Sequence, residues 1–206
     1  MAKLMKPVCR HCRRYAEKLY LKGSRCETDK CPIDPRQHKR IAAMPKTSEY
    51  GMQLREKNKA KIYYGVFERQ FKKYFTIAKK SKGVTGEMLL QLLERRVDNI
   101  IYRLKWVESR RMAKQVIVHG AILVNGKKVD RPSYLVNMED EITVKKGSAL
   151  EKHILKIMEE RKGQILPVWI ESLDSNDIKA KITRFPTRAE IPLSINEQSI
   201  INFYSK

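Results

Sequence analysis

Long apolar runs are missing from this sequence: no stretch approaches the roughly 20 consecutive apolar residues that a bilayer span requires. The basic N-terminus also lacks the apolar core of a secretory signal peptide. A basic protein of the membrane surface would concentrate its charge on an amphipathic helix with exposed aromatics. Here Lys and Arg are spread along the chain. The sequence therefore predicts a cytoplasmic protein with no membrane partner.

Catalytic motifs are missing too. The sequence contains no G-x-S-x-G, no phosphate-binding G-x4-G-K-S/T and no H-E-x-x-H, and its four histidines are scattered. One carboxylate, Asp98, lies beside a long apolar stripe and could act as a catalytic base. It is better explained as the partner of a nearby arginine such as Arg95 or Arg103, at helical or near-helical spacing. We predict that the chain is not an enzyme and takes no small-molecule substrate.

Acidic residues are scarce: 23 Asp and Glu stand against 44 Lys and Arg, which gives a net charge of +21 at pH 7. Solubility alone needs far less charge. An excess of this size favours a polyanionic partner, because neutralising phosphates releases their counterions and drives binding. The composition therefore predicts a nucleic-acid partner, and its 42% of hydrophobic residues are enough to bury one or two compact cores.

Cysteines are absent after residue 31, and the four that exist lie close together as Cys9, Cys12, Cys26 and Cys31. Their pattern is C-x2-C, thirteen residues, then C-x4-C, the paired spacing that tetrahedral thiolate coordination of zinc needs. His11 could replace one thiolate, but four thiolates already close the coordination shell. We predict one structural zinc ion that stabilises an arm too short to fold by burial alone. An iron-sulfur cluster on the same thiolates, or four unrelated free thiols, are the alternatives.

Apolar periodicity begins after residue 47. Aromatic and aliphatic residues from Tyr63 to Phe75 recur at helical spacing, which indicates one buried helical stripe, although a stacking platform for bases is the alternative. Gly83 is predicted to end that segment. Thr85 is then a candidate N-cap for a helix with the longest stripe in the chain, Leu89 to Leu104. Trp106 and Tyr134 are similarly ambiguous between core and stacking roles.

The second half of the chain mixes helix-like and strand-like sequence patterns. Ser109 is a plausible cap for a short helix that ends at Gly120, and Asn125-Gly126 is the dipeptide best suited to a tight hairpin turn. The further elements expected are strands at 121–124, 127–129, 134–136, 141–144, 165–170 and 178–183, a helix over 150–161 and a last helical turn over 196–204.

The short helix and the hairpin together predict a basic surface. Arg110, Arg111 and Lys114 lie on one side of this helix, opposite its apolar residues, with Gln115 and His119 close by. The hairpin adds Asn125, Lys127 and Lys128, so helix and turn can hold a phosphate backbone from two sides, which suits recognition of RNA by shape. A charged helix face is often only solvated. Because few acidic residues lie in this region, binding is favoured over that alternative.

Several segments closely resemble the S-four RNA-binding module, which also occurs in pseudouridine synthases and tyrosyl-tRNA synthetases. They are LERRVDN (93–99), QVIVH (115–119), VNGK (124–127), PSY (132–134) and DEI (140–142). Its flanks resemble small-subunit ribosomal protein four of bacteria and organelles, in YGMQLREK (50–57), YGVFERQF (64–71), TGE (85–87), INE (195–197) and YSK (204–206). The cysteines resemble the zinc-binding version of that family. Departures are Lys105-Trp106 where a glycine or small residue is usual, Lys114 for an arginine, and Arg36 for a loop glycine.

The resemblance implies an α+β fold with three parts: a zinc-stapled basic arm (1–45), a helical domain (46–94, completed by 185–206), and the RNA-binding module with its β extension (95–184), whose helices pack on a small antiparallel sheet. It implies a structural constituent of the small subunit that binds ribosomal RNA, nucleates assembly of the subunit body and contributes to translational accuracy. The implied neighbours are small-subunit proteins five and three and messenger RNA where it enters the subunit. The location is the cytoplasm, with an organellar stroma or matrix less favoured.

Two other classes fit less well. An RNA-modifying enzyme would need a further catalytic domain, and a zinc-bearing DNA regulator would need a helix-turn-helix or C2H2 pattern, which we do not find. The side chains predicted to contact RNA are basic, amide or imidazole groups of the arm, the helical domain and the module. They are Arg10, Arg13, Arg14, Lys22, Arg55, Lys57, Arg69, Lys72, Arg96, Arg103, Arg110, Arg111, Lys114, Gln115, His119, Asn125, Lys127 and Lys128.

Overall fold

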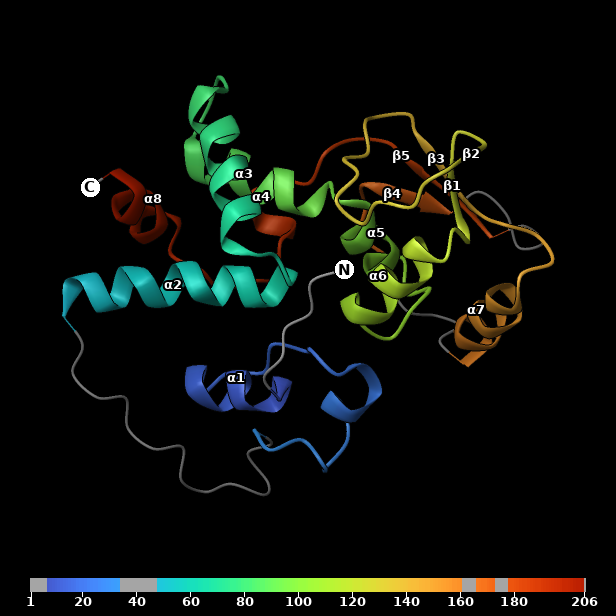
Figure 1. Ribbon diagram of the computed structural model, residues 1–206, viewed down its shortest axis with the longest axis horizontal. Helices are drawn as coiled ribbons and strands as arrows, with labels where there is room; N and C mark the ends of the chain where they lie inside the picture. Colours follow the sequence, from blue (N-terminus) through green and yellow to red (C-terminus); the bar gives the residue numbers. More distant parts are fainter. Residues whose placement is uncertain (1–6, 34–47, 161–165, 173–177, 206) are drawn as a thin grey trace. The chain divides into compact units, whose positions relative to one another are not determined.

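A computed structural model describes residues 7–33, 48–160, 166–172 and 178–205. These residues form eight α-helices, two 3-10 helices and one five-stranded sheet (Figure 1). The chain divides into two compact units, Met1–Met88 with Leu193–Lys206, and Leu89–Pro192. In the described ranges, no helix has both the length and the hydropathy to cross a membrane. The combination of helices with an antiparallel sheet that the predicted α+β class requires is confirmed.

The first unit is helical. Its elements are α1 (Val8–Tyr15), the 3-10 helix η1 (Gly23–Cys26), α2 (Glu49–Tyr64), α3 (Glu68–Lys80), the start of α4 (Thr85–Glu94) and α8 (Glu197–Ser205). Ser48 caps α2 by accepting a hydrogen bond from the Gly51 backbone N–H at 3.2 Å. Gly65 ends α2 in the left-handed conformation, with φ of 61°, a region that favours glycine.

The aromatic stripe therefore belongs to two helices, not one. The expectation of a single helix through Tyr63 and Phe75 was wrong, because the chain turns at Gly65 and α3 starts afresh at Glu68. Its interpretation as core is confirmed, since most of its aromatic side chains are buried, whereas Phe67 is exposed. The helical spacing of apolar residues continues across the turn at Gly65 because both helices pack their apolar faces inward.

The C-terminal helix completes this unit. The Tyr204 hydroxyl donates to Glu68 Oε1 at 2.7 Å, and the Tyr204 ring stacks on Phe75 with centroids 4.7 Å apart. Burial opposes ionisation of Glu68, but hydrogen bonds from Lys61, Tyr204 and Lys57 lower the pKa of Glu68 to about 2. The Glu68 carboxylate is therefore held in its charged form at the junction of α2, α3 and α8.

The second unit carries the sheet. Its helices are the rest of α4, α5 (Val97–Arg103), α6 (Arg110–Val118), α7 (Ala149–Glu160) and the 3-10 helix η2 (Arg188–Glu190). Its strands are β1 (Ile122–Val124), β2 (Lys127–Lys128), β3 (Glu141–Val144), β4 (Ile170–Ser172) and β5 (Lys179–Ile182), in the antiparallel order β2-β1-β3-β5-β4. The small antiparallel sheet with helices packed on it is confirmed.

The core of this unit joins helices and sheet through one apolar cluster. Ile117 of α6, Ile122 of β1 and Ile142 of β3 are fully buried, and both tryptophans, Trp106 and Trp169, are 2% exposed. Trp106 is thus a core residue and not a stacking platform, whereas Tyr134 is exposed. Because the chain has two tryptophans and both lie here, their fluorescence reports on this unit.

Two expectations for this unit were wrong. The stripe from Leu89 to Leu104 is split between α4 and α5, because Arg96 is extended, with φ −65° and ψ 134°. The strand expected over 134–136 is reduced to a single bridge between Leu135 and Arg96. The strand expected over 165–170 lies partly outside the described residues, and β4 begins at Ile170.

The backbone is left-handed at the predicted Asn125-Gly126 turn and at Lys105, where the sequence departs from the family that it resembles. Asn125 and Gly126 have φ of 51° and 74°, as a tight hairpin between β1 and β2 requires, and the hairpin is confirmed. Lys105 has φ of 60°. It stands where that family usually has a glycine or small residue, and the conformation explains that preference, since a left-handed lysine is strained.

Candidate nucleic-acid interface

Helix α6 supplies a rigid basic face. Ser109 caps it by accepting from the Met112 backbone N–H at 3.3 Å, so the capping prediction is confirmed. One side of α6 is buried in the core. The side chains of Arg111, Gln115 and His119 are exposed. Because residues three and four apart share a helix face, Arg111 and Gln115 point to the same side of α6.

The hairpin is anchored to its neighbouring strand by Asn125. Its Nδ2 donates to Asp140 Oδ1 at 2.8 Å and its Oδ1 accepts from the Glu141 backbone N–H at 2.9 Å. Asn125 was predicted to contact RNA; in this structure its amide holds the turn. Lys127 and Lys128, which follow that fixed turn, are exposed.

Helix and hairpin meet at Gly120. A Cβ atom on Gly120 would clash with Cε of Lys128, so the lysine stem runs directly over this glycine. Gly120 follows the end of α6, where the carbonyl ends of the helix favour a cation. The predicted residues of the helix and of the turn are thus brought together on one surface, defined here as the α6–hairpin surface: Arg111, Gln115, His119, Lys127 and Lys128.

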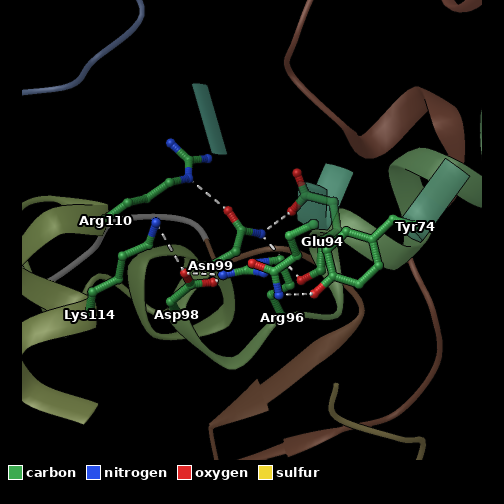
Figure 2. A network of polar contacts seen from close by, with 8 residues as sticks. Tyr74, Glu94, Arg96, Asp98, Asn99, Arg110 and Lys114 are labelled. Atoms are coloured by element: carbon green, nitrogen blue, oxygen red, sulfur yellow. Dashed lines mark hydrogen bonds and ion pairs between the residues drawn. The ribbon is translucent and has the colours of Figure 1, made fainter. Parts of the chain in front are cut away.

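Helix α6 also contributes Arg110 and Lys114 to a buried network of charged side chains, drawn in Figure 2. Arg96 donates to both carboxylate oxygens of Asp98, from Nε at 3.0 Å and from Nη2 at 2.7 Å. Lys114 Nζ lies 3.6 Å from Asp98 Oδ2. Burial lowers the pKa of Lys114 from its usual range, although the Asp98 charge opposes this change.

A second carboxylate extends the network. Glu94 accepts from Asn99 Nδ2 at 2.5 Å and from Arg103 Nη2 at 2.6 Å. Asn99 in turn accepts from Arg110 Nε at 2.8 Å, and the Arg110 guanidinium lies 4.2 Å from the centroid of the Tyr102 ring. Asn99 therefore links the carboxylate on α4 to the first residue of α6 (Figure 2).

These contacts change the interpretation of four predicted RNA contacts: Arg96, Arg103, Arg110 and Lys114. Their charged groups engage carboxylates, an amide and an aromatic ring inside the protein. The expectation that Asp98 pairs with a nearby arginine is confirmed, but its partner is Arg96 and not Arg95 or Arg103. We did not single out Glu94 and Asn99 from the sequence. A carboxylate and an amide within an otherwise apolar helical stripe could have indicated that both side chains are buried and hydrogen-bonded.

The predicted residues of the first unit fall into two groups. Lys57 is buried, with Nζ 3.0 Å from Glu68 Oε1, and Arg55 donates to the Arg14 carbonyl at 3.1 Å, so both are engaged with protein. The remaining side chains are exposed; they are Arg10, Arg13, Arg14, Lys22, Arg69 and Lys72. The three arginines of this set in α1, with His11, line an open pocket of about 540 Å³.

The four cysteines of the described arm form no disulfide. Cys12, Cys26 and Cys31 are buried and Cys9 is partly so. Burial raises the pKa of Cys12, the charges of the other three cysteines act in the same direction, and a hydrogen bond from the Leu19 backbone opposes them. The Lys22 backbone N–H also points to Cys26 Sγ at 3.3 Å.

The fit of this arm to a metal rests on its donor chemistry. Four thiols in two sequence pairs, one with an N–H directed at its sulfur, suit a soft-ligand site. Among the described residues, no group of three or more His, Cys, Asp or Glu side chains is arranged so that it could hold a metal ion. Zinc thus stays a prediction.

Comparison with known proteins gives a consistent match. The model of the ribosomal protein S4/S9 N-terminal domain matches residues 3–94, and that of the S4 domain matches residues 95–142. The chain is 48% identical over 211 residues to small ribosomal subunit protein uS4 of Halothermothrix orenii. It is 50% identical over 214 residues to the uS4 protein of Thermodesulfovibrio yellowstonii. Both alignments cover 100% of this chain and of the relative.

Proposed function

The chain belongs to the uS4 family of small-subunit ribosomal proteins, and from that membership we propose that it is a non-enzymatic constituent of the small ribosomal subunit that binds ribosomal RNA. The observation that supports RNA binding most directly is the exposed α6–hairpin surface. It presents Arg111, Lys127 and Lys128 on a capped helix and an anchored turn. The location that follows from this function is the cytoplasm.

Binding at this surface is proposed to act through phosphates and shape. The three cations face the sugar-phosphate backbone, and Gln115 and His119 add hydrogen-bonding groups beside them. The buried network supports helix α6, because Asn99 accepts a hydrogen bond from Arg110 at the start of that helix. A rigid support matters, since each side chain that is already ordered loses less entropy on binding.

The test neutralises two of these cations, Arg111→Gln with Lys128→Gln. Each phosphate contact contributes about 0.9 to the slope of log K against log salt concentration, so we expect the slope to fall by about 2. Filter binding or fluorescence anisotropy with a small-subunit ribosomal RNA fragment measures it. The control is Lys152→Gln with Lys156→Gln, which removes the same charge from exposed positions of α7.

Two results would contradict the proposal. A wild-type chain that binds duplex DNA or unrelated RNA as tightly as small-subunit RNA at physiological salt has no ribosomal specificity. A variant that keeps the wild-type slope shows that the α6–hairpin surface does not face phosphates.

We also propose the finer roles that the family resemblance implies. The chain nucleates assembly of the subunit body, contributes to translational accuracy, and lies beside small-subunit proteins five and three and messenger RNA where it enters the subunit. The support is the resemblance alone. Reconstituting the small subunit without this chain tests the assembly role, and an intact particle from that mixture would contradict it.

The arm is proposed to hold one structural zinc ion on Cys9, Cys12, Cys26 and Cys31. Bound zinc would cross-link the two cysteine pairs of the arm and so stabilise it. We expect metal analysis of the purified chain to find one zinc per molecule, and less than half of that after Cys12→Ser with Cys26→Ser. Iron with visible charge-transfer absorption would support the cluster alternative, and the absence of any bound metal in freshly purified protein would contradict both.

A further inference from the structure

The outer face of α3 carries a cluster of cations. Arg69, Lys72, Lys73, Lys79 and Lys80 are all exposed, and they are defined here as the α3 ridge. At about 100° of rotation per residue, they fall within roughly one third of the helix circumference. Thr76, also exposed, lies midway along this face. Lys72 and Lys79 flank it on one side, and Lys73 and Lys80 on the other.

The opposite face of α3 is the core-facing one. Phe71, Tyr74, Phe75 and Ala78 are buried there, so the ridge points away from the packed interior. The helix has one acidic residue, Glu68, and its carboxylate is taken by Lys57, Lys61 and Tyr204. No carboxylate of α3 is therefore left for the ridge.

The ridge lacks the counter-charges of an ordinary solvent-exposed helix. Among the residues whose placement is described, no ion pair includes a ridge side chain. Arg69 lies three and four residues before Lys72 and Lys73, where like charges destabilise a helix. A surface that needed only solubility would interleave Glu with Lys. Repulsion among the ridge cations is instead unfavourable in the absence of a bound anion.

The dimensions fit a nucleic-acid backbone. Lys80 lies eleven positions after Arg69, which gives a length of about 16 Å at about 1.5 Å per residue. One nucleic-acid strand carries one phosphate per about 3.4 Å of helix axis, so the ridge can face several phosphates. The centre of the ridge is the polar Thr76. Protein interfaces have a centre of buried aromatic or aliphatic anchors, which favours RNA over an acidic protein as the partner.

We propose that the α3 ridge is a second phosphate-binding surface for structured RNA, built on the first unit and distinct from the α6–hairpin surface of the second. The inference rests on the proposed function as an RNA binder, and it assigns Lys73, Lys79 and Lys80 to contacts that the sequence did not suggest. Binding relieves the repulsion among the ridge cations, because phosphates supply the missing counter-charges.

The test is Lys73→Gln with Lys80→Gln in the full chain. We expect the slope of log K against log salt to fall by about 2 for a small-subunit ribosomal RNA fragment, as two phosphate contacts are lost. The unfolding midpoint of the free protein should not fall and should rise slightly, because neither lysine has a described protein partner and their loss relieves repulsion within the ridge. The pair Lys152→Gln and Lys156→Gln removes two exposed lysines of α7 and controls for loss of net charge.

The outcomes separate this inference from the proposed function. If the wild-type chain binds the RNA and the ridge variant keeps the wild-type slope, the ridge does not contact phosphates and the inference is overturned. The same holds if the variant loses binding to an acidic ribosomal protein but not to RNA. If the wild-type chain shows no preference for the RNA, the proposed function itself fails.

Discussion

Replacing Asp98 by asparagine is expected to destabilise the second unit by about 3–5 kcal/mol. Asp98 and Arg96 are 1% and 2% exposed, and the carboxylate accepts two hydrogen bonds from the guanidinium. A neutral amide at this position cannot neutralise Arg96, which would remain charged and out of contact with water. Lys114 would lose its nearest carboxylate as well. Removing one partner of a buried pair is costly for this reason, whatever the net worth of the pair.

Urea unfolding followed by tryptophan fluorescence measures this change, because Trp106 and Trp169 both lie in the core of the second unit. The matched control is Glu139→Gln, which makes the same carboxylate-to-amide change at a surface ion pair with Lys181, where the glutamate side chain is 68% exposed. That change should cost less than about 1 kcal/mol. Equal, small effects of the two substitutions would show that solvent compensates Arg96.

Local signals in the sequence predicted the elements whose geometry depends on one or two residues. The Ser109 cap and the Asn125-Gly126 turn are examples, because hydrogen bonding and positive φ are properties of those residues themselves. The breaks in the two long helical stripes were missed. A turn of three residues, as at Gly65, preserves the spacing of apolar side chains closely enough that the pattern continues across it.

The candidate site was predictable as a surface but not residue by residue. Composition shows an excess of cations, yet it cannot show which of them are neutralised inside the fold. Arg110 and Arg111 are neighbours in sequence, and only the folded chain places one against Asn99 and leaves the other exposed. The partner of Asp98 was misjudged because helical spacing was assumed across a residue, Arg96, that is extended.

Three segments far apart in sequence converge on Lys59 in the first unit. This lysine is 6% exposed. Its Nζ donates to the Ser194 carbonyl at 2.6 Å and forms an ion pair with Glu17. Ser194 Oγ also donates to Glu17 Oε1 at 3.2 Å. One side chain of α2 thus holds both the cysteine-bearing arm and the segment that leads into α8.

Lys59→Met should therefore release the arm and the C-terminal segment together. Methionine keeps an apolar stem of similar length but leaves the Ser194 carbonyl and the Glu17 carboxylate without their shared cation, at a cost of about 2–3 kcal/mol. Hydrogen exchange of the full chain followed by mass spectrometry measures it, with faster exchange expected in both α1 and α8. The control is Lys61→Met on the same helix, which should cost less than about 1 kcal/mol because Glu68 keeps Lys57 and Tyr204. If exchange rises in only one of the two segments, Lys59 does not couple them, and each is held by its own contacts with α2.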